Sequence, residues 1–190
     1  IAGISHGGQI SNCHVIGTNL LGFSSIGGIA GANTQYSTIS DCSVTGQIEE
    51  NTHFDVLGSA VGGVVGENTF WSDIENCYAI CDITGNDYIG GIAGTNAIYS
   101  TIRNSYAQGT IDGTENKIGG IVGWNAGTSD VEYCYTSSLI KATGTDDVGG
   151  AIGNSRTNGS ETYTACFWDS SVNCLLPGIG NWSHAEVIES

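Results

Sequence analysis

Cysteine is the side chain with the clearest chemical potential in this sequence, and its positions are regular. The chain contains seven cysteines. Four of them stand three residues after Ile or Val, in the pairs Ile10–Cys13, Ile39–Cys42, Ile74–Cys77 and Val131–Cys134. Thiols can form disulfides or bind zinc, but the one close pair, Cys77-x-x-x-Cys81, lacks the closed spacing that zinc sites favour. Disulfides and unpaired thiols both remain open.

Other residues that catalyse reactions do not converge on one site. The four histidines occupy different positions in the repeat that organises the chain, and no Gly-x-Ser-x-Gly motif occurs. Polysaccharide-cleaving β-helices combine acidic groups with nearby Lys or Arg. The four basic residues also fall at four different repeat positions: Arg103, Lys117, Lys141 and Arg156. The sequence therefore predicts no catalytic residue and no enzyme.

The charge balance excludes further classes. Four Lys and Arg against 19 Asp and Glu give a net charge of −15. Nucleic acids need clustered cations, so no nucleic-acid partner is expected. No apolar run approaches the roughly 18 residues of a membrane span. Asp and Asn oxygens in turns could hold calcium, but no nine-residue calcium repeat is present, so we predict no cofactor.

A glycine motif reveals how these residues are positioned. Gly-Gly-apolar-apolar-Gly occurs five times, with first glycines 35, 28, 29 and 30 residues apart. The copies begin at Gly27, Gly62, Gly90, Gly119 and Gly149. Asn follows in four copies and Ser in the fifth: Asn33, Asn68, Asn96, Asn125 and Ser155. Fifteen of the 30 glycines lie in this motif, so glycine enrichment reflects repeated geometry.

The residues between glycine motifs alternate between small or apolar and polar types. Such alternation is typical of strands with one buried face, and the glycine density disfavours long helices. One unit cannot bury its own core, whereas stacked units share one. We therefore predict an all-β fold, a β-solenoid of about five to six coils with a period of about 28–35 residues. Glycines would serve positive φ or close backbone approach, and the Asn residues would stack as a ladder.

The repeat unit resembles a known family. The segment Ile74 to Tyr78 (Ile-Glu-Asn-Cys-Tyr), with Gly90 to Asn96, is similar to the GLUG repeat of bacterial secreted and surface proteins, as is Ile102 to Tyr106 with Gly119 to Asn125. Ser105 and Asn154-Ser155 depart from the pattern. The resemblance implies a β-helical stalk or spacer in an extracellular or cell-surface protein. It implies no activity, because the family's catalytic parts lie outside the repeats.

Stacking of the coils bears on the cysteines. Five share one repeat position and should form an interior column: Cys13, Cys42, Cys77, Cys134 and Cys166. Neighbouring coils lie about 4.8 Å apart, within the Cα range of about 4.4–6.8 Å for disulfides. Cys13–Cys42 and Cys134–Cys166 are the cleanest candidate bridges. A column of unpaired buried thiols is the alternative.

Two surface features are candidate interaction sites. The longest insertion, 49–59, is a candidate contact loop. It contains Glu49, Glu50, His53, Phe54 and Asp55. Two aromatic columns are also expected outside the core, and both could stack structurally or bind sugars or proteins. They comprise Tyr36, Trp71 and Tyr99, and Tyr78, Tyr106, Tyr135 and Phe167.

The two ends of the sequence differ from the repeats. Ile1 begins in the middle of a coil, which fits a piece of a longer protein or a subunit that completes its coil against another subunit. Residues 175–190 lose the repeat and should cap the 1–174 solenoid or be exchanged between subunits. Ile1, Ile4, Val187 and Ile188 are the candidate inter-subunit residues.

Together these features predict a non-enzymatic extracellular protein with a structural or adhesive role. It would be a surface stalk or the subunit of a head-to-tail filament, with end-to-end self-association. The alternative is an adhesin module that binds glycan or a host or cell-surface protein. A polysaccharide-acting enzyme is the third and weakest interpretation.

Overall fold

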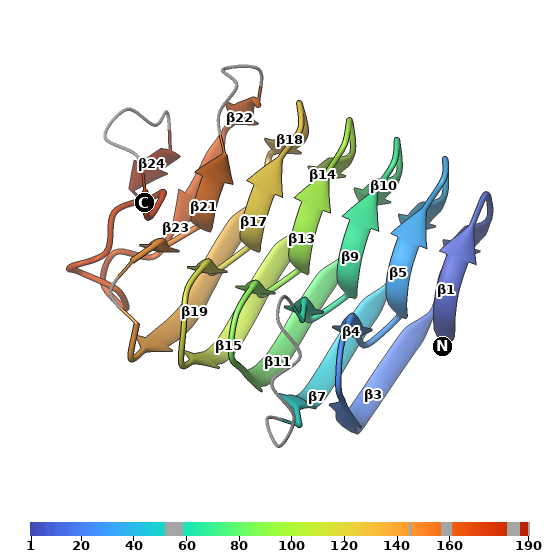
Figure 1. Ribbon diagram of the computed structural model, residues 1–190, viewed down its shortest axis with the longest axis horizontal. Helices are drawn as coiled ribbons and strands as arrows, with labels where there is room; N and C mark the ends of the chain where they lie inside the picture. The colour runs from blue at the N-terminus through green and yellow to red at the C-terminus, as the bar shows by residue number, and fades with distance from the viewer. Residues whose placement is uncertain (52–58, 145, 157–160, 182–186, 190) are drawn as a thin grey trace.

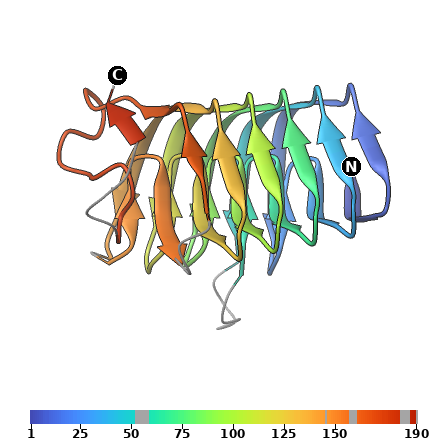
Figure 2. The same cartoon turned by 90° about the horizontal axis from the view of Figure 1, so that it is seen from above.

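The computed structural model shows a parallel β-solenoid (Figures 1 and 2). The structure describes residues 1–51, 59–144, 146–156, 161–181 and 187–189. No helix occurs among these residues. The chain winds through four sheets in each coil, and the strands pair in parallel with those of the neighbouring coils. There are about five turns with a period near 29 residues, as the glycine spacing predicts.

The four sheets each collect one strand per coil. Sheet A contains β1 (Ala2–His6), β5 (Ala30–Thr34), β9 (Val65–Thr69), β13 (Ala93–Ala97), β17 (Val122–Ala126) and β21 (Ile152–Arg156). Sheet B contains β2 (Gln9–Ser11), β6 (Thr38–Ser40), β10 (Asp73–Glu75), β14 (Thr101–Arg103), β18 (Asp130–Glu132) and β22 (Tyr163–Thr164).

The other two sheets close the coil. Sheet C contains β3 (His14–Gly22), β7 (Ser43–Glu50), β11 (Tyr78–Gly85), β15 (Tyr106–Gly113), β19 (Tyr135–Ala142), β23 (Cys166–Trp168) and β24 (Val187–Glu189). Sheet D contains β4 (Ile26–Gly27), β8 (Val61–Gly62), β12 (Ile89–Gly90), β16 (Ile118–Gly119) and β20 (Val148–Gly149).

The core consists of apolar columns parallel to the solenoid axis. Strand registers place Ile39, Ile74, Ile102 and Val131 on successive strands of sheet B. All four side chains are fully buried. Each coil alone would expose these residues, so neighbouring coils supply the hydrophobic burial that holds the stack together.

The motif glycines are required by close backbone approach. A Cβ added to Gly63 would lie 2.2 Å from the carbonyl oxygen of Gly91, and one added to Gly90 would lie 2.0 Å from that of Ala93. Positive φ is not the reason at these positions. In the described residues, positive φ falls mainly on corner residues with side chains, such as Tyr88 (51°) and Tyr99 (60°). Of the two predicted roles for the repeated glycines, the structure therefore supports close approach.

Candidate binding surfaces

The predicted Asn ladder runs through the interior between sheets A and B. Each Nδ2 donates to the Oδ1 of the next Asn: Asn33 to Asn68 (2.9 Å), Asn68 to Asn96 (2.8 Å) and Asn96 to Asn125 (2.7 Å). Each amide also donates to the carbonyl of a Ser four residues later, at 2.9–3.3 Å. The amides satisfy the backbone of two coils at once, which is a structural role.

The ladder ends differently at its two termini. Asn125 Nδ2 donates to the hydroxyl of Tyr163 (3.0 Å), which donates to Ser155 Oγ (2.6 Å). Ser155 is small, so Tyr163 fills the space where an amide would stand, and burial raises the Tyr163 pKa to about 12. At the other end, Asn33 Oδ1 is buried without a hydrogen-bond partner among the described residues. Ser5, its neighbour in register, does not extend the ladder.

The five predicted cysteines do form an interior column, and Ser105 completes it. All seven thiols in the chain are free in the structure. The thiols at this position hydrogen-bond the carbonyl two residues earlier, as Cys77 does to Glu75 (3.2 Å), and Ser105 does the same to Arg103 (2.8 Å). Burial raises the Cys77 pKa to about 12. The shared bond with Ser105 indicates that this position stabilises the turn.

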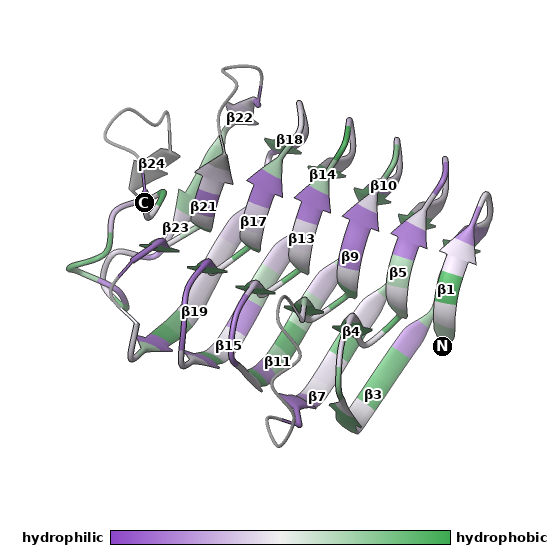
Figure 3. Cartoon of the chain, in the orientation of Figure 1, coloured by the Kyte–Doolittle hydropathy of each residue, from purple (hydrophilic) through white to green (hydrophobic). Residues whose placement is uncertain are grey.

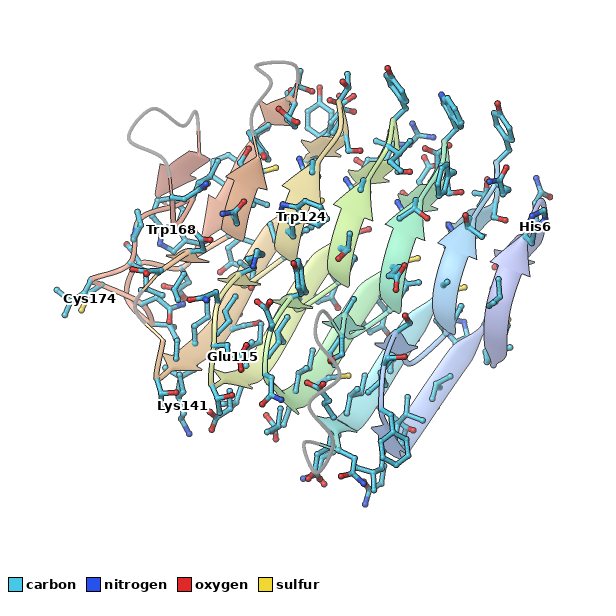
Figure 4. The ribbon with its side chains drawn as sticks, in the orientation of Figure 1. His6, Glu115, Trp124, Lys141, Trp168 and Cys174 are labelled. Atoms are coloured by element: carbon cyan, nitrogen blue, oxygen red, sulfur yellow. The ribbon has the colours of Figure 1, made fainter. Side chains whose placement is uncertain are left out.

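The two candidate bridges differ in their surroundings. A side-chain hydrogen bond to Cys166, together with burial, holds the pKa of Cys134 well above its usual range. Cys13 is only partly buried, beside buried Cys42. The Cys13–Cys42 and Cys134–Cys166 disulfides therefore stay predictions. Outside the column, Cys81 is buried and Cys174 is exposed, where it projects away from the solenoid (Figure 4).

The predicted aromatic columns lie on the surface. Tyr36, Trp71 and Tyr99 stack with ring centroids 5.4 Å apart and interplanar angles of 9° and 8°. All three are exposed. Tyr78 and Tyr106 stack at 5.0 Å, and strand pairing continues their column through Tyr135 and Phe167. We call the first set the corner stack.

A different surface, on the outer face of sheet A, contains a cavity of about 540 Å³. Glu67, Thr95 and Trp124 are neighbours in register on β9, β13 and β17, so Thr95 lies between the carboxylate and the indole. Thr95, Ala97 and Ala126 form the floor, and Tyr88 and Phe70 also line the cavity. We call this cavity the sheet A groove; Trp124 is labelled on β17 in Figure 4.

Tyr88 and Trp124 of the sheet A groove contact each other, and Tyr88 also contacts Lys117. The Tyr88 and Trp124 rings meet edge to face, with centroids 5.6 Å apart at 68°. Lys117 Nζ lies 4.4 Å from the Tyr88 ring centroid and 3.4 Å from Asp87 Oδ2. Burial raises the Asp87 pKa, and Lys117 opposes this shift. The cation thus fixes Tyr88 and is itself paired.

The repeat pattern of the sequence does not predict the groove. Its signal is the variable position between the last motif glycine and the Asn. That position carries Ala32, Glu67, Thr95, Trp124 and Asn154 in successive coils. The residue type at this outward position therefore differs from coil to coil, whereas the inward-facing position next to it repeats Asn in four of the coils.

The 49–59 insertion is only partly described. His53, Phe54 and Asp55 lie outside the described residues. Glu50 is buried, accepts hydrogen bonds from Ser59 Oγ and from the backbone of Asn86 (2.8 Å), and so closes the base of the insertion. Glu49 is exposed at the end of β7. Glu50 is therefore a structural residue of this insertion.

The first coil presents a free edge and outward apolar side chains. β1, β2, β3 and β4 each form the outer strand of their sheet at this end. Ile4 is 67% exposed and Ile1 69% exposed, and Ile16 and Leu21 on β3 are also exposed. Figure 3 shows hydrophobic (green) segments on β1 and β3. The end also contains a hollow of about 730 Å³.

The last coil is covered by the segment that follows it. Gly150 and Ala151 donate backbone hydrogen bonds to Pro177 (2.7 Å) and Gly178 (3.0 Å). The Asn181 side chain exchanges two hydrogen bonds with the Ser155 backbone (3.0 and 3.1 Å), as a neighbouring strand would. β24 pairs Val187 and Ile188 with Cys166 and Phe167 of the same chain. The tail thus caps its own coil in this structure.

Among the described residues, no group of three or more His, Cys, Asp or Glu is placed to hold a metal ion. In the same part of the chain, no helix is long and apolar enough to cross a membrane.

Comparison with protein-family models identifies the GLUG motif at residues 24–49, 58–84 and 85–112. These segments are three consecutive repeats of the solenoid, which confirms the resemblance predicted from the glycine motif. The glycine copies at Gly119 and Gly149 extend the same pattern beyond the matched residues. A search of curated proteins gave no match, and neither did a search of solved structures.

Proposed function

From the premise that this chain is a GLUG-repeat β-solenoid protein, we propose that it is a non-enzymatic structural element, a stiff stalk displayed outside the cell. The observation that carries the proposal is the Asn ladder. It joins successive coils through hydrogen bonds of 2.7–2.9 Å between side chains, from Asn33 to Asn125. A buried ladder of side-chain hydrogen bonds between repeated units resists bending and local opening.

The ends favour a stalk over a head-to-tail filament. Head-to-tail association needs two complementary free ends. The first coil has free strand edges, but the last coil is covered by the Pro177–Gly180 segment and by β24. A filament would require that this tail be displaced. A stalk requires only that the first coil be joined to another coil, which is the end-to-end association expected from Ile1 and Ile4.

The extracellular location is part of the proposal and rests on the resemblance of the repeats to those of secreted and surface proteins. The test is immunogold electron microscopy of intact cells of the source organism, with antibodies against the purified chain. Label outside the envelope, on cells not permeabilised, is the expected result. Label confined to the cell interior would overturn the stalk proposal, as would turnover of a polysaccharide by the purified chain.

A second candidate function, a glycan- or protein-binding adhesin module, is favoured by the corner stack. Tyr36, Trp71 and Tyr99 present three stacked rings to solvent. Exposed aromatic rings often anchor binding partners, since they bury large areas at low conformational cost. A variant with alanine at all three positions of the corner stack should lose adhesion to the cells that the protein binds. Unchanged adhesion would contradict the adhesin function.

A further inference from the structure

The sheet A groove has the dimensions and walls of a ligand site. Its volume of about 540 Å³ lies within the range of about 300–1,000 Å³ for small-molecule pockets. Glu67 and Trp124 stand two strands apart, a separation of about 9.6 Å at the usual parallel spacing. Only Thr95 lies between them in that column, so a ring-sized molecule can rest against the strands.

The groups that face the groove are already fixed. Tyr88 is placed against the Trp124 ring by Lys117, and Glu67 accepts a hydrogen bond from Ser25. Side chains held in this way lose little conformational entropy when a ligand binds. The floor of Thr and Ala is too small to fill the space, and so the hollow remains open.

The chemistry of the lining selects among ligand classes. Trp124 and Phe70 offer apolar ring surface, while the Glu67 carboxylate and the Thr69 and Thr95 hydroxyls offer hydrogen bonds. Sugars combine both needs, because their C–H faces contact aromatic rings and their hydroxyls donate to carboxylates.

The charges around the groove disfavour charged ligands. Glu67 and the net charge of −15 disfavour anionic ligands. Among the side chains that the structure describes, the cation beside the groove is Lys117, which is paired with Asp87 and lies over the Tyr88 ring. That same contact occupies an aromatic surface that an organic cation would need.

We propose that the sheet A groove binds one neutral sugar residue of a glycan, with Trp124 as the aromatic platform and Glu67 as the hydrogen-bond acceptor. The proposal goes beyond the structural role and uses residues distinct from the corner stack. If the groove binds nothing, the stalk proposal still stands on its own cell-surface test.

The test is a binding screen on the whole chain by saturation-transfer NMR and calorimetry. The probes are neutral disaccharides (maltose, cellobiose and lactose), a uronic-acid disaccharide and choline. We expect at least one neutral disaccharide to bind. Trp124→Ala should weaken that affinity by up to about tenfold, since an aromatic contact contributes up to ~1.5 kcal/mol. Glu67→Gln, which keeps the shape, should weaken it several-fold.

Matched variants separate this groove from other surfaces and from misfolding. Trp71→Ala removes an aromatic residue of the corner stack and should leave the affinity unchanged. Trp124→Phe keeps an aromatic ring and serves as the test if Trp124→Ala fails to fold. Its affinity for the sugar should lie between those of the unsubstituted chain and of Trp124→Ala. Three results would overturn the proposal: no neutral sugar binds, choline or the uronic acid binds instead, or the sugar affinity is unchanged in both Trp124 variants.

Discussion

The two ends of the solenoid are built from the same repeat but finish in opposite ways. At the first coil the sheet edges are free, the Asn ladder stops at an unpaired Asn33 Oδ1, and Ile4 points outward where later coils carry Glu67 or Thr95. At the last coil, side chains of the tail take over backbone pairing through Asn181 and Asn173.

The difference shows how a short segment covers the strand edges of a coil. The last coil needs only a few polar side chains that imitate a strand, together with Tyr163, which replaces an amide of the ladder. The first coil has none of these features. We infer that stability and association are controlled separately, stability by the ladder inside and association by whether the strand edges of a terminal coil are covered.

Removal of the tail should give the largest effect. A chain ending at Cys174 loses the hydrogen bonds of Pro177, Gly178 and Asn181 and leaves free strand edges at both ends. Two complementary free ends allow open head-to-tail growth. We expect concentration-dependent filaments by electron microscopy and light scattering. The intact chain is the control, and a truncated chain that stays monomeric at high concentration would contradict the capping role.

Breaking the ladder in its middle should cost more than breaking it at the open end. Asn96→Ala leaves Asn125 Oδ1 without its donor and removes one acceptor of Asn68 Nδ2, which keeps the carbonyls of Ser72 and Thr101. The buried orphaned oxygen costs about 1–3 kcal/mol and the second lost hydrogen bond about 1 kcal/mol, so we expect a loss of ~3 kcal/mol in the free energy of unfolding.

The matched variant Asn33→Ala leaves only the Asn68 oxygen orphaned and should cost ~1–2 kcal/mol. Urea titrations of both variants provide the comparison. Equal losses would show that the open end is as constrained as the middle.

Buried thiols should make the solenoid sensitive to alkali. Burial raises the Cys77 pKa from 9.0 to about 12 and the Cys81 pKa to about 11. A raised folded-state pKa gives stability that is fully present below pH 9.0 and is lost as the pH rises toward the folded value. Unfolding free energy should therefore fall between pH 9 and about 12.

Cys77→Ser, which copies the natural Ser105, should reduce the steepness of that fall. The same free-energy measurements on this variant check the assignment. An unchanged pH dependence would exclude Cys77 as its source.

The smallest predicted effect is a gain in stability from a substitution in the first coil. Ser5→Asn places an amide beside Asn33, whose Oδ1 has no hydrogen-bond partner in the described part of the chain. A new hydrogen bond should stabilise the chain by ~1 kcal/mol, visible as a higher thermal midpoint. Ser5→Ala serves as the control and should give no gain; a gain from Ser5→Ala alone would contradict the ladder explanation.

Most of the fold could be predicted from the sequence because the repeat encodes it. The glycine spacing, the Asn ladder, the cysteine column and the aromatic stacks all follow from equivalent positions in stacked coils. The sheet A groove could not be predicted in this way. It arises where one outward position varies, with Glu67, Thr95 and Trp124 in successive coils, and from the place of Tyr88 beside it. The capping by Asn181 likewise has no repeat signal.

The central claim is that interchangeable coils, held in register, form a structural rod. Its most direct test is a pair of deletions followed by circular dichroism and urea unfolding. Deletion of residues 79–106 removes 28 residues, which is the register offset between β11 and β15, and joins Tyr78 to Ala107. This variant should remain a cooperatively folded β protein. Deletion of residues 80–106 shifts the register by one residue, turns inward side chains outward and should abolish folding. Equal behaviour of the two variants would contradict the account.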